Sequence, residues 1–285
     1  MLDLYAVGDL SWFVCLPVPH MPLPDEVLFV QGSQRLLGND AAIVAFFTAR
    51  QGLCSCLLAT NAISRHDGLP LLDLLQQEGV DVSQVNTEAS TTPVTYFLSR
   101  IDSDERSGLV EAYPFRYAAI EHLPASRFVY ADVYEEHIDQ RLALIEKLSS
   151  SNACCLINLS ASHLIEKGRL LANIPSIDTL LMRGSGSIAD ACILGRYMLQ
   201  ICHAQFALIT LGEMGAVLVE QHDVYVVPAE TIKPLRTIGA GASFAAGFIC
   251  ALARGATHRE AVVYASKLAA TFCTLEHNPL EVLKK

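Results

Sequence analysis

One stretch in the C-terminal part of the chain has the residue types of a phosphate-binding turn. It reads Thr237-Ile238-Gly239-Ala240-Gly241-Ala242-Ser243-Phe244-Ala245-Ala246-Gly247. Two glycines flank an alanine, and the apolar run from Phe244 to Ala253 that follows predicts a loop entering a helix. Free backbone N–H groups and the positive end of a helix dipole together hold an anion without side chains. We therefore expect Gly239, Ala240 and Gly241 to form an anion hole.

The same stretch lacks a carboxylate that could act as a general base. Ala242 follows the second glycine, and its methyl group accepts neither a proton nor a hydrogen bond. Ser243 comes next, but a serine hydroxyl without a partner is a poor base at neutral pH. Whether this site can catalyse a reaction depends on the missing acid.

Composition and charge exclude two kinds of partner. The 285 residues include 30 acids and 20 bases, for a formal net charge of −10, with no cluster of Lys and Arg. Because nucleic-acid binding needs clustered cations, we expect no nucleic-acid partner. No apolar run approaches the roughly 18 to 20 residues of a membrane span. The start, Met1 to Tyr5, has no basic region of a signal peptide, so we expect a cytoplasmic protein.

The nine cysteines lie mostly in apolar segments, which favours small buried thiols in a reducing compartment. The pair Cys54 and Cys56 could bind a metal, but no second Cys or His pair lies nearby, and a structural role is favoured. The histidines near predicted turns have no ligand spacing between them; they are His66, His163, His203 and His222. We therefore expect no metal-binding residues.

Strands and helices alternate along most of the chain. Helices are expected over Asp40–Arg50, Pro70–Gln77, His137–Ser149, Leu164–Leu171, Ile188–Ile201 and, after a capping box of Thr257 and Glu260, Ala261–Thr274. Apolar runs between them predict strands over Leu4–Val7, Leu53–Ala59, Phe128–Ala131, Ala153–Leu159, Thr179–Met182 and Phe206–Leu211. This alternation predicts an α/β fold with a mostly parallel sheet covered on both faces.

Two other regions are expected to be extended. Residues 11–37 contain four prolines, which disfavour a helix. Thr92–Ile101 and Leu109–Tyr113 read as two strands joined by the polar turn Asp102–Gly108, which predicts a hairpin.

Four motifs, in this order of elements, resemble those of the ribokinase or PfkB family of carbohydrate kinases. Arg236–Phe244, with Gly247 three residues on, matches the family signature D-T-x-G-A-G-D-x-F. Thr210–Ala216 is similar to its T-L-G-x-x-G segment, Val227–Ala229 to its V-P-A strand, and Gly38–Ala45 to its G-G-x-x-x-N-x-A helix start. Several motifs in the right order are a much stronger signal than any one of them.

The resemblance implies a three-layer α/β/α sandwich formed by residues 1–285 as one domain. A small β lid, inserted from about 11–37 and 92–113, would cover a sugar or another small-molecule ligand, and it commonly supplies a homodimer contact. ATP or ADP with Mg²⁺ is the implied cofactor. The implied nucleotide-binding positions are Thr210, Gly212, Gly215, Gly239 and Gly241.

The departures from the family pattern fall on its chemistry. The catalytic Asp of the signature is Ala242 here, and its opening acid is Arg236. The substrate-pocket positions are Phe13, Gly38, Asn39 and Ile43, of which only Gly38 keeps the family residue. Loss of an acid and an amide removes several hydrogen bonds to a sugar, each about 0.5 to 1.5 kcal/mol or more when charged.

A further departure lies in the family's N-x-x-E segment, which helps to organise Mg²⁺ and phosphate. It aligns with Arg183-Gly184-Ser185-Gly186, where both polar members are lost. Arg183 could instead bind an anion directly. A shifted alignment would give the acidic role to Asp190.

Three functions therefore stay open. The first is a pseudokinase that keeps the scaffold and still binds a nucleotide or a phosphorylated ligand, and the joint changes at Ala242, Phe13 and Ile43 favour it. The second is an active ATP-dependent phosphotransferase acting on an atypical sugar or nucleoside. The third is a structural subunit without a ligand.

Overall fold

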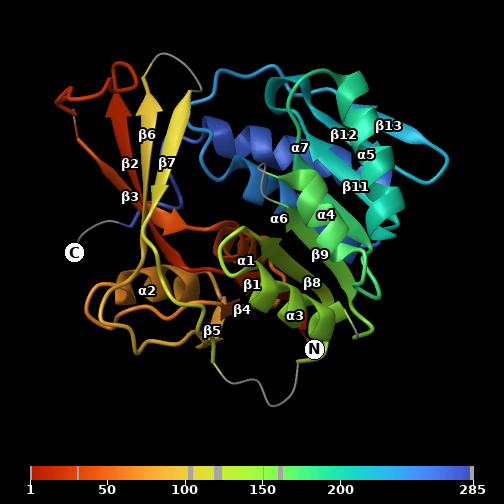
Figure 1. Ribbon diagram of the computed structural model, residues 1–285, viewed down its shortest axis with the longest axis horizontal. Coiled ribbons are helices and arrows are strands. Elements are labelled where there is room, and N and C mark those ends of the chain that lie inside the picture. The colour runs from red at the N-terminus through yellow and green to blue at the C-terminus, as the bar shows by residue number, and fades with distance from the viewer. Residues whose placement is uncertain are drawn as a thin grey trace.

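A large and a small sheet organise the protein in a computed structural model that describes residues 2–30, 32–101, 105–118, 124–149, 151–159 and 163–282 (Figure 1). In spatial order the large sheet consists of β13 (Val224–Val227), β12 (Ala216–Val219), β11 (Phe206–Thr210), β10 (Thr179–Arg183), β9 (Cys154–Leu159), β8 (Ser126–Val133), β1 (Leu2–Gly8), β4 (Ser55–Ala59) and β5 (Asp81–Gln84). The pairs from β11 to β5 are parallel, and β12 and β13 are antiparallel. The mostly parallel sheet is thus confirmed.

Helices cover both faces of this sheet. Their bounds are α1 (Asp40–Arg50), α2 (Leu69–Gln77), α3 (Ile138–Ser149), α4 (Leu164–Leu171), α5 (Ile188–Cys202), α6 (Ala240–Ala253) and α7 (His258–Thr274). Side chains of α1, α2, α6 and α7 form one core with the sheet, and those of α3, α4 and α5 form the other. The expected α/β/α sandwich is confirmed, because strands buried on both faces need a helical layer on each side.

The small sheet is the expected lid. It consists of β3 (Gln34–Gly38), β2 (Ser11–Val18), β6 (Val94–Arg100) and β7 (Arg106–Val110), in that spatial order. Strands β6 and β7 pair antiparallel, which confirms the hairpin, but the second strand runs over Arg106–Val110 and not over Leu109–Tyr113. Arg106, Ser107 and Gly108 therefore pair with β6 and do not belong to the turn. Asp102, Ser103 and Asp104 of its predicted turn lie outside the described residues. Figure 1 shows these strands projecting to one side of the large sheet.

Helix α7 begins with the predicted capping box. The Glu260 N–H donates to Thr257 Oγ1 at 3.3 Å, and the Thr257 N–H donates to Glu260 Oε2 at 2.8 Å. Two backbone donors that a helix start leaves without partners are satisfied in this way.

The start of α6 differs from the sequence expectation. The helix begins at Ala240, so Ala240 and Gly241 belong to its first turn and are not part of a loop. Gly239 is the N-cap residue and adopts φ of 93°, a conformation that glycine accepts without steric cost. A Cβ atom at Gly239 would also lie 2.8 Å from Leu280 Cδ1. One glycine therefore makes the turn, and small residues continue it as helix.

None of the helices within these ranges combines the length and the apolar character needed to cross a membrane.

Candidate functional site

Four polar side chains line the carboxyl ends of four neighbouring parallel strands. They are Asp132 in β8, Asn158 in β9, Arg183 in β10 and Thr210 in β11. Two positions before each of them lies a residue whose side chain packs in the same core as α6. These core residues are Tyr130, Leu156, Leu181 and Leu208. Since side chains two apart on a strand share a face, the four lie on the α6 side of the sheet. We call these four residues the edge row.

The first turn of α6 offers unused hydrogen-bond donors near this edge. The first helical bond runs from the Ser243 N–H to the Gly239 carbonyl at 2.9 Å. Among the described residues, no backbone carbonyl or capping side chain accepts from the N–H groups of Gly241 and Ala242. Gly241 is exposed, and a Cβ atom there would meet nothing within 4 Å. This turn has the donors and the access that an anion requires.

No base replaces the missing acid from within this turn. Ala242 is 2% exposed. Ser243 is completely buried, and its hydroxyl donates to the Ala240 carbonyl at 2.9 Å. Ser243 therefore cannot act as the base.

The segment after β11 is a tight turn built on two glycines. Gly212 has φ of 59° and open space around its Cα, whereas Gly215 has φ of 100°. A Cβ atom at Gly215 would lie only 2.0 Å from the Val227 carbonyl oxygen. Gly215 is thus required by packing against β13, and Gly212 and Thr210 are the positions left at the edge of the sheet.

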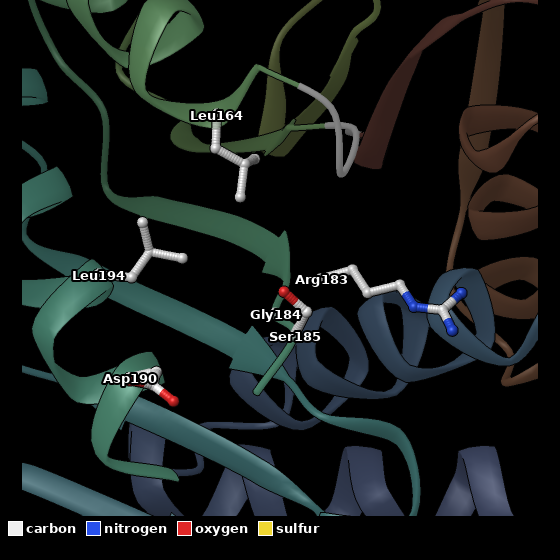
Figure 2. A pocket seen from close by; sticks show the side chains of 6 residues that line it. All are labelled: Leu164, Arg183, Gly184, Ser185, Asp190 and Leu194. Atoms are coloured by element: carbon white, nitrogen blue, oxygen red, sulfur yellow. The ribbon is translucent and has the colours of Figure 1, made fainter. Parts of the chain in front are cut away.

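Arg183 provides a positive charge beside Thr210. The two residues are register partners, and the Gly184 N–H donates to the Thr210 carbonyl at 2.9 Å. The Arg183 side chain is exposed, and its guanidinium has no hydrogen bond or ion pair to any residue that the structure describes. Arg183 lines a cavity of about 280 Å³ together with Leu164 and Leu194, and Figure 2 shows its guanidinium pointing away from these two leucines. The guanidinium is therefore available on the α6 side of the sheet.

Asp190 is not available as a ligand at this site. The Asp190 carboxylate accepts from the Ser187 N–H at 2.8 Å and from the Ser187 hydroxyl at 2.7 Å. It caps its own helix, so the alternative that gave Asp190 an acidic role at the site is not supported. Within the described ranges, no group of three His, Cys, Asp or Glu side chains could hold a metal ion.

The four predicted substrate-pocket positions lie at the junction of the lid with α1. Phe13 is 8% exposed and packs edge-on against Phe97, with ring centroids 4.9 Å apart. A Cβ atom at Gly38 would lie 2.5 Å from the Phe13 ring. The Asn39 amide donates to the hydroxyl of Ser11 at 3.0 Å. Ile43 is completely buried, so its side chain belongs to the core and does not face a ligand.

Sequence reasoning missed a buried cluster of acids at the start of α1. The Asn158 amide donates to Asp132 Oδ1 at 2.9 Å and to Asp40 Oδ2 at 3.2 Å. Burial, which disfavours the charged form, raises the pKa of both carboxyl groups. The position of Asp132, one residue past the expected strand Phe128–Ala131, was the one signal available.

A second missed cluster joins β1 to α3. Asp9 and Arg141 form an ion pair at 2.7 Å, and Asp9 also accepts from the hydroxyls of Thr60 and Tyr113.

Arg236, which replaces the opening acid of the signature, binds to the end of α7. Its guanidinium donates to carbonyls at the C-terminal end of α7, those of Phe272, Leu275 and Glu276. A cation at that end of a helix is favourable.

Comparisons with known proteins agree with the fold. Residues 170–277 match the pfkB family carbohydrate kinase model. A nucleoside kinase from Methanothermobacter thermautotrophicus is 22% identical over 283 residues, covering 94% of this chain and 88% of that protein.

Two solved structures share the fold. A ribokinase from Cryptococcus neoformans in complex with ADP superposes with a TM-score of 0.79 and 18% identity, covering 98% of this chain and 96% of that one. A nucleoside kinase from Burkholderia thailandensis in complex with inosine has a TM-score of 0.74 and 13% identity, covering 98% and 93%. Residues 170–277 thus carry the pfkB family carbohydrate kinase match, and the chain as a whole shares the ribokinase-like fold.

Proposed function

We propose that the protein binds an adenine nucleotide, or another phosphorylated small molecule, between the first turn of α6 and Arg183, and that its phosphotransfer activity is strongly impaired. The observation that carries this proposal is that two backbone N–H donors at the start of α6 have no acceptor within the described part of the chain, while the residue at the base position is an alanine. The N–H groups of Gly241 and Ala242 have no acceptor among the described residues, while the side chain of Ala242 has no acceptor to offer.

The ligand class is supported by chemistry and by the relatives. Helix N-termini and arginine side chains both favour phosphate. The Cryptococcus neoformans ribokinase holds ADP, and an Arabidopsis thaliana ribokinase of the same fold was crystallised with ribose and ATP. We propose that this chain keeps the nucleotide half of such a site, with Thr210, Gly212, Gly239 and Gly241 around the ligand.

Arg183 is proposed to supply the positive charge that a metal ion would otherwise bring to the phosphates. Its guanidinium is on the α6 side of the sheet, and the described residues there hold no metal-binding cluster. An arginine side chain can bind a diphosphate without Mg²⁺. ADP is therefore expected to bind in the presence of EDTA as well as with Mg²⁺.

The loss of turnover is expected because the site has no general base. A positioned general base contributes roughly 10² to 10⁴ in rate, and neither Ala242 nor the buried Ser243 can act as one. On the lid side, Phe13 packs against Phe97 and offers no hydrogen bond at the position where the family resemblance places a sugar-binding acid. ATP-dependent phosphorylation of a panel of sugars and nucleosides is expected to be undetectable. Clear turnover that is abolished by Gly241→Asp would favour an active kinase instead.

Thermal melting tests nucleotide binding directly. A ligand that binds only the native state raises the melting temperature, by about 2.7 kcal/mol of stability at 100 times its Kd. Millimolar ADP should stabilise the wild-type protein and have a much smaller effect on Arg183→Ala. Arg169→Ala, which removes an exposed arginine of α4, is the matched control and should respond like the wild type. No shift in the wild type at millimolar ADP would favour a purely structural subunit.

We further propose a homodimer that forms through the lid. The edge strand β7 exposes Leu109 (63%) and Val110 (55%), and Phe29 in the β2–β3 connection is 92% exposed. Exposed edge strands with apolar side chains invite pairing with another chain. Light scattering should give a dimer mass for the wild type and a monomer mass for Val110→Lys, and a monomeric wild type would refute the proposal.

A cytoplasmic location is proposed as well. None of the nine cysteines forms a disulfide in the structure, which is typical of a reducing compartment. Cell fractionation would test this location.

A further inference from the structure

Two carboxyl groups near the start of α1 accept hydrogen bonds from the same side-chain amide. Asp40 is the first residue of that helix, and Asp132 lies near the end of β8. The amide nitrogen of Asn158 donates to both, at 3.2 Å and 2.9 Å. Two ionised carboxylates held against one amide in a buried site would repel each other.

Asp132 is enclosed by backbone on two sides. Its Oδ2 accepts from the Ala41 N–H at 2.8 Å and so caps α1, because the N-cap residue Asn39 makes no capping bond of its own. A Cβ atom at Gly8 would lie 2.7 Å from the same oxygen. Asp132 is 2% exposed, whereas Asp40 is only partly buried. If the two groups repel, Asp40 is the one that can move.

Few positively charged side chains lie near Asp40 and Asp132. The charged and titratable groups around this pair are Tyr130 within β8, Tyr134 just after β8, Asp9 just after β1 and Arg106 in β7, with Arg183 of the edge row two strands away in β10. Arg141, the remaining buried cation nearby, is committed to Asp9 at 2.7 Å. The first turn of α6 contributes no acidic or basic side chain.

The pair lies at the same edge as the anion site. Asp132 and Arg183 are separated by β9 alone, which places them roughly 10 Å apart, since adjacent strands are about 4.8 Å apart. Helices α1 and α6 run side by side in the same direction, because the Arg254 guanidinium after α6 donates to the Gln51 carbonyl after α1 at 2.8 Å. A change of one charge at the pair therefore acts on an anion held by α6 and Arg183.

We propose that Asp40 and Asp132 hold one proton between them at neutral pH, and that this proton sets the affinity of the neighbouring site for its anionic ligand. When the proton leaves to solvent at higher pH, both groups become carboxylates and Asp40 turns toward the open edge. The added negative charge weakens anion binding. By the same linkage, binding of an anion at a pH near the transition takes up a proton. This inference rests on the proposed nucleotide site.

The test is calorimetric titration of the wild-type protein with ADP at pH 7 and pH 9 in EDTA. We expect Kd to rise several-fold between these values, and the heat at pH 8 to depend on the buffer, as proton uptake requires. Asp132→Asn keeps an acceptor for the Ala41 N–H and should bind ADP with a Kd that changes little with pH. Asp40→Asn should do the same if Asp132→Asn folds poorly. Asp190→Asn, which alters an exposed acid of the α5 cap, is the control and should keep the wild-type profile.

The outcomes separate this inference from the proposed function. Binding of ADP with the same pH profile in the wild type and both Asp→Asn variants would overturn the shared proton and leave the nucleotide site standing. If ADP binds at neither pH 7 nor pH 9, the proposed nucleotide site is refuted, and so is the effect of the shared proton on ligand affinity. In that case a carboxyl ¹³C NMR titration still decides on the proton, because a single transition shared by two resonances would support it and two ordinary transitions would refute it.

Discussion

Asp9 and Arg141 lie on different elements of the molecule, and their ion pair at 2.7 Å is almost completely enclosed, with 1% and 2% of the two side chains exposed. Arg141 also donates to the Glu136 carbonyl at 2.8 Å. The Tyr113 hydroxyl, from the segment that leaves the lid, donates to the same Asp9 carboxylate. One buried charge pair therefore ties β1, α3 and the base of the lid together.

Removing one partner of this pair should be strongly destabilising. Arg141→Met leaves Asp9 buried without its cation, which costs about 3 to 5 kcal/mol in comparable cases. Arg127→Ala, which breaks an exposed pair with Asp3 at 3.0 Å, is the matched control and should cost about 1 kcal/mol or less. Urea unfolding of the three proteins measures this difference, and equal losses would show that the buried pair has no special weight.

Gly212 and Gly215, in the turn after β11, should respond differently to substitution by alanine. At Gly215 an added Cβ atom would lie 2.0 Å from the Val227 carbonyl oxygen and 2.7 Å from the Ala229 nitrogen, so Gly215→Ala must displace backbone. At Gly212 the same atom meets nothing within 4 Å, and only the positive φ of 59° is unfavourable. We expect Gly212→Ala to cost about 1 kcal/mol or somewhat more and Gly215→Ala to cost several times as much. The melting temperatures of the two variants test the order.

His258 should make the stability of the free protein depend on pH. It stacks on Phe206, with ring centroids 3.7 Å apart, and burial lowers its pKa because the charged form is poorly solvated there. A group whose pKa is lower in the folded state than in the unfolded state, about 6.5, favours folding above that value and loses this contribution as pH falls. The loss should lie below about pH 6.5.

The variant His258→Phe keeps the stacked ring and removes the titration. The stability difference between wild type and variant should therefore stay constant from pH 7 to 8 and shift against the wild type from pH 6.5 to 5. Urea unfolding at each pH provides the measurement. Parallel pH profiles for the two proteins would mean that His258 has the same pKa in both states.

The local pattern of apolar residues is enough to predict most helices and strands of the fold. Asp40–Arg50 and Leu164–Leu171 were predicted with the bounds that the structure shows, because each is closed by a residue that disfavours helix continuation or by a change of apolar period. The start of α6 was placed four residues too late. Glycine and alanine in its first turn carry no apolar period, and the capping glycine at 239 is visible only through its backbone angle.

The site was predicted only where a motif marks it. The glycines at 239, 212 and 215 belong to short patterns, whereas Asp132 and Asn158 become neighbours through strand pairing 26 residues apart. No sequence pattern expresses the sharing of one amide by Asp40 and Asp132. The sequence shows that Phe13 and Ile43 are apolar, but whether such a side chain faces a ligand or the core is decided by packing.

The anion site itself can be tested by placing a charge in front of it. Gly241 is the second residue of α6 and has open space where its side chain would be. An acid in the first turn of a helix interacts favourably with the dipole, by about 0.3 to 1 kcal/mol, so Gly241→Asp should melt at or above the wild-type temperature. The same carboxylate would occupy the position of the phosphate and repel it. We expect ADP to stabilise Gly241→Asp far less than the wild type.

Gly241→Ala is the matched control for this change. It adds a methyl group, keeps the N–H donor and introduces no charge, so it should retain most of the ADP-dependent shift. Equal responses to ADP in the Asp and Ala variants would place the nucleotide elsewhere, because a phosphate held by the first turn of α6 must sense a carboxylate there at almost any ionic strength. A response lost only in the Asp variant would assign the phosphate to this turn.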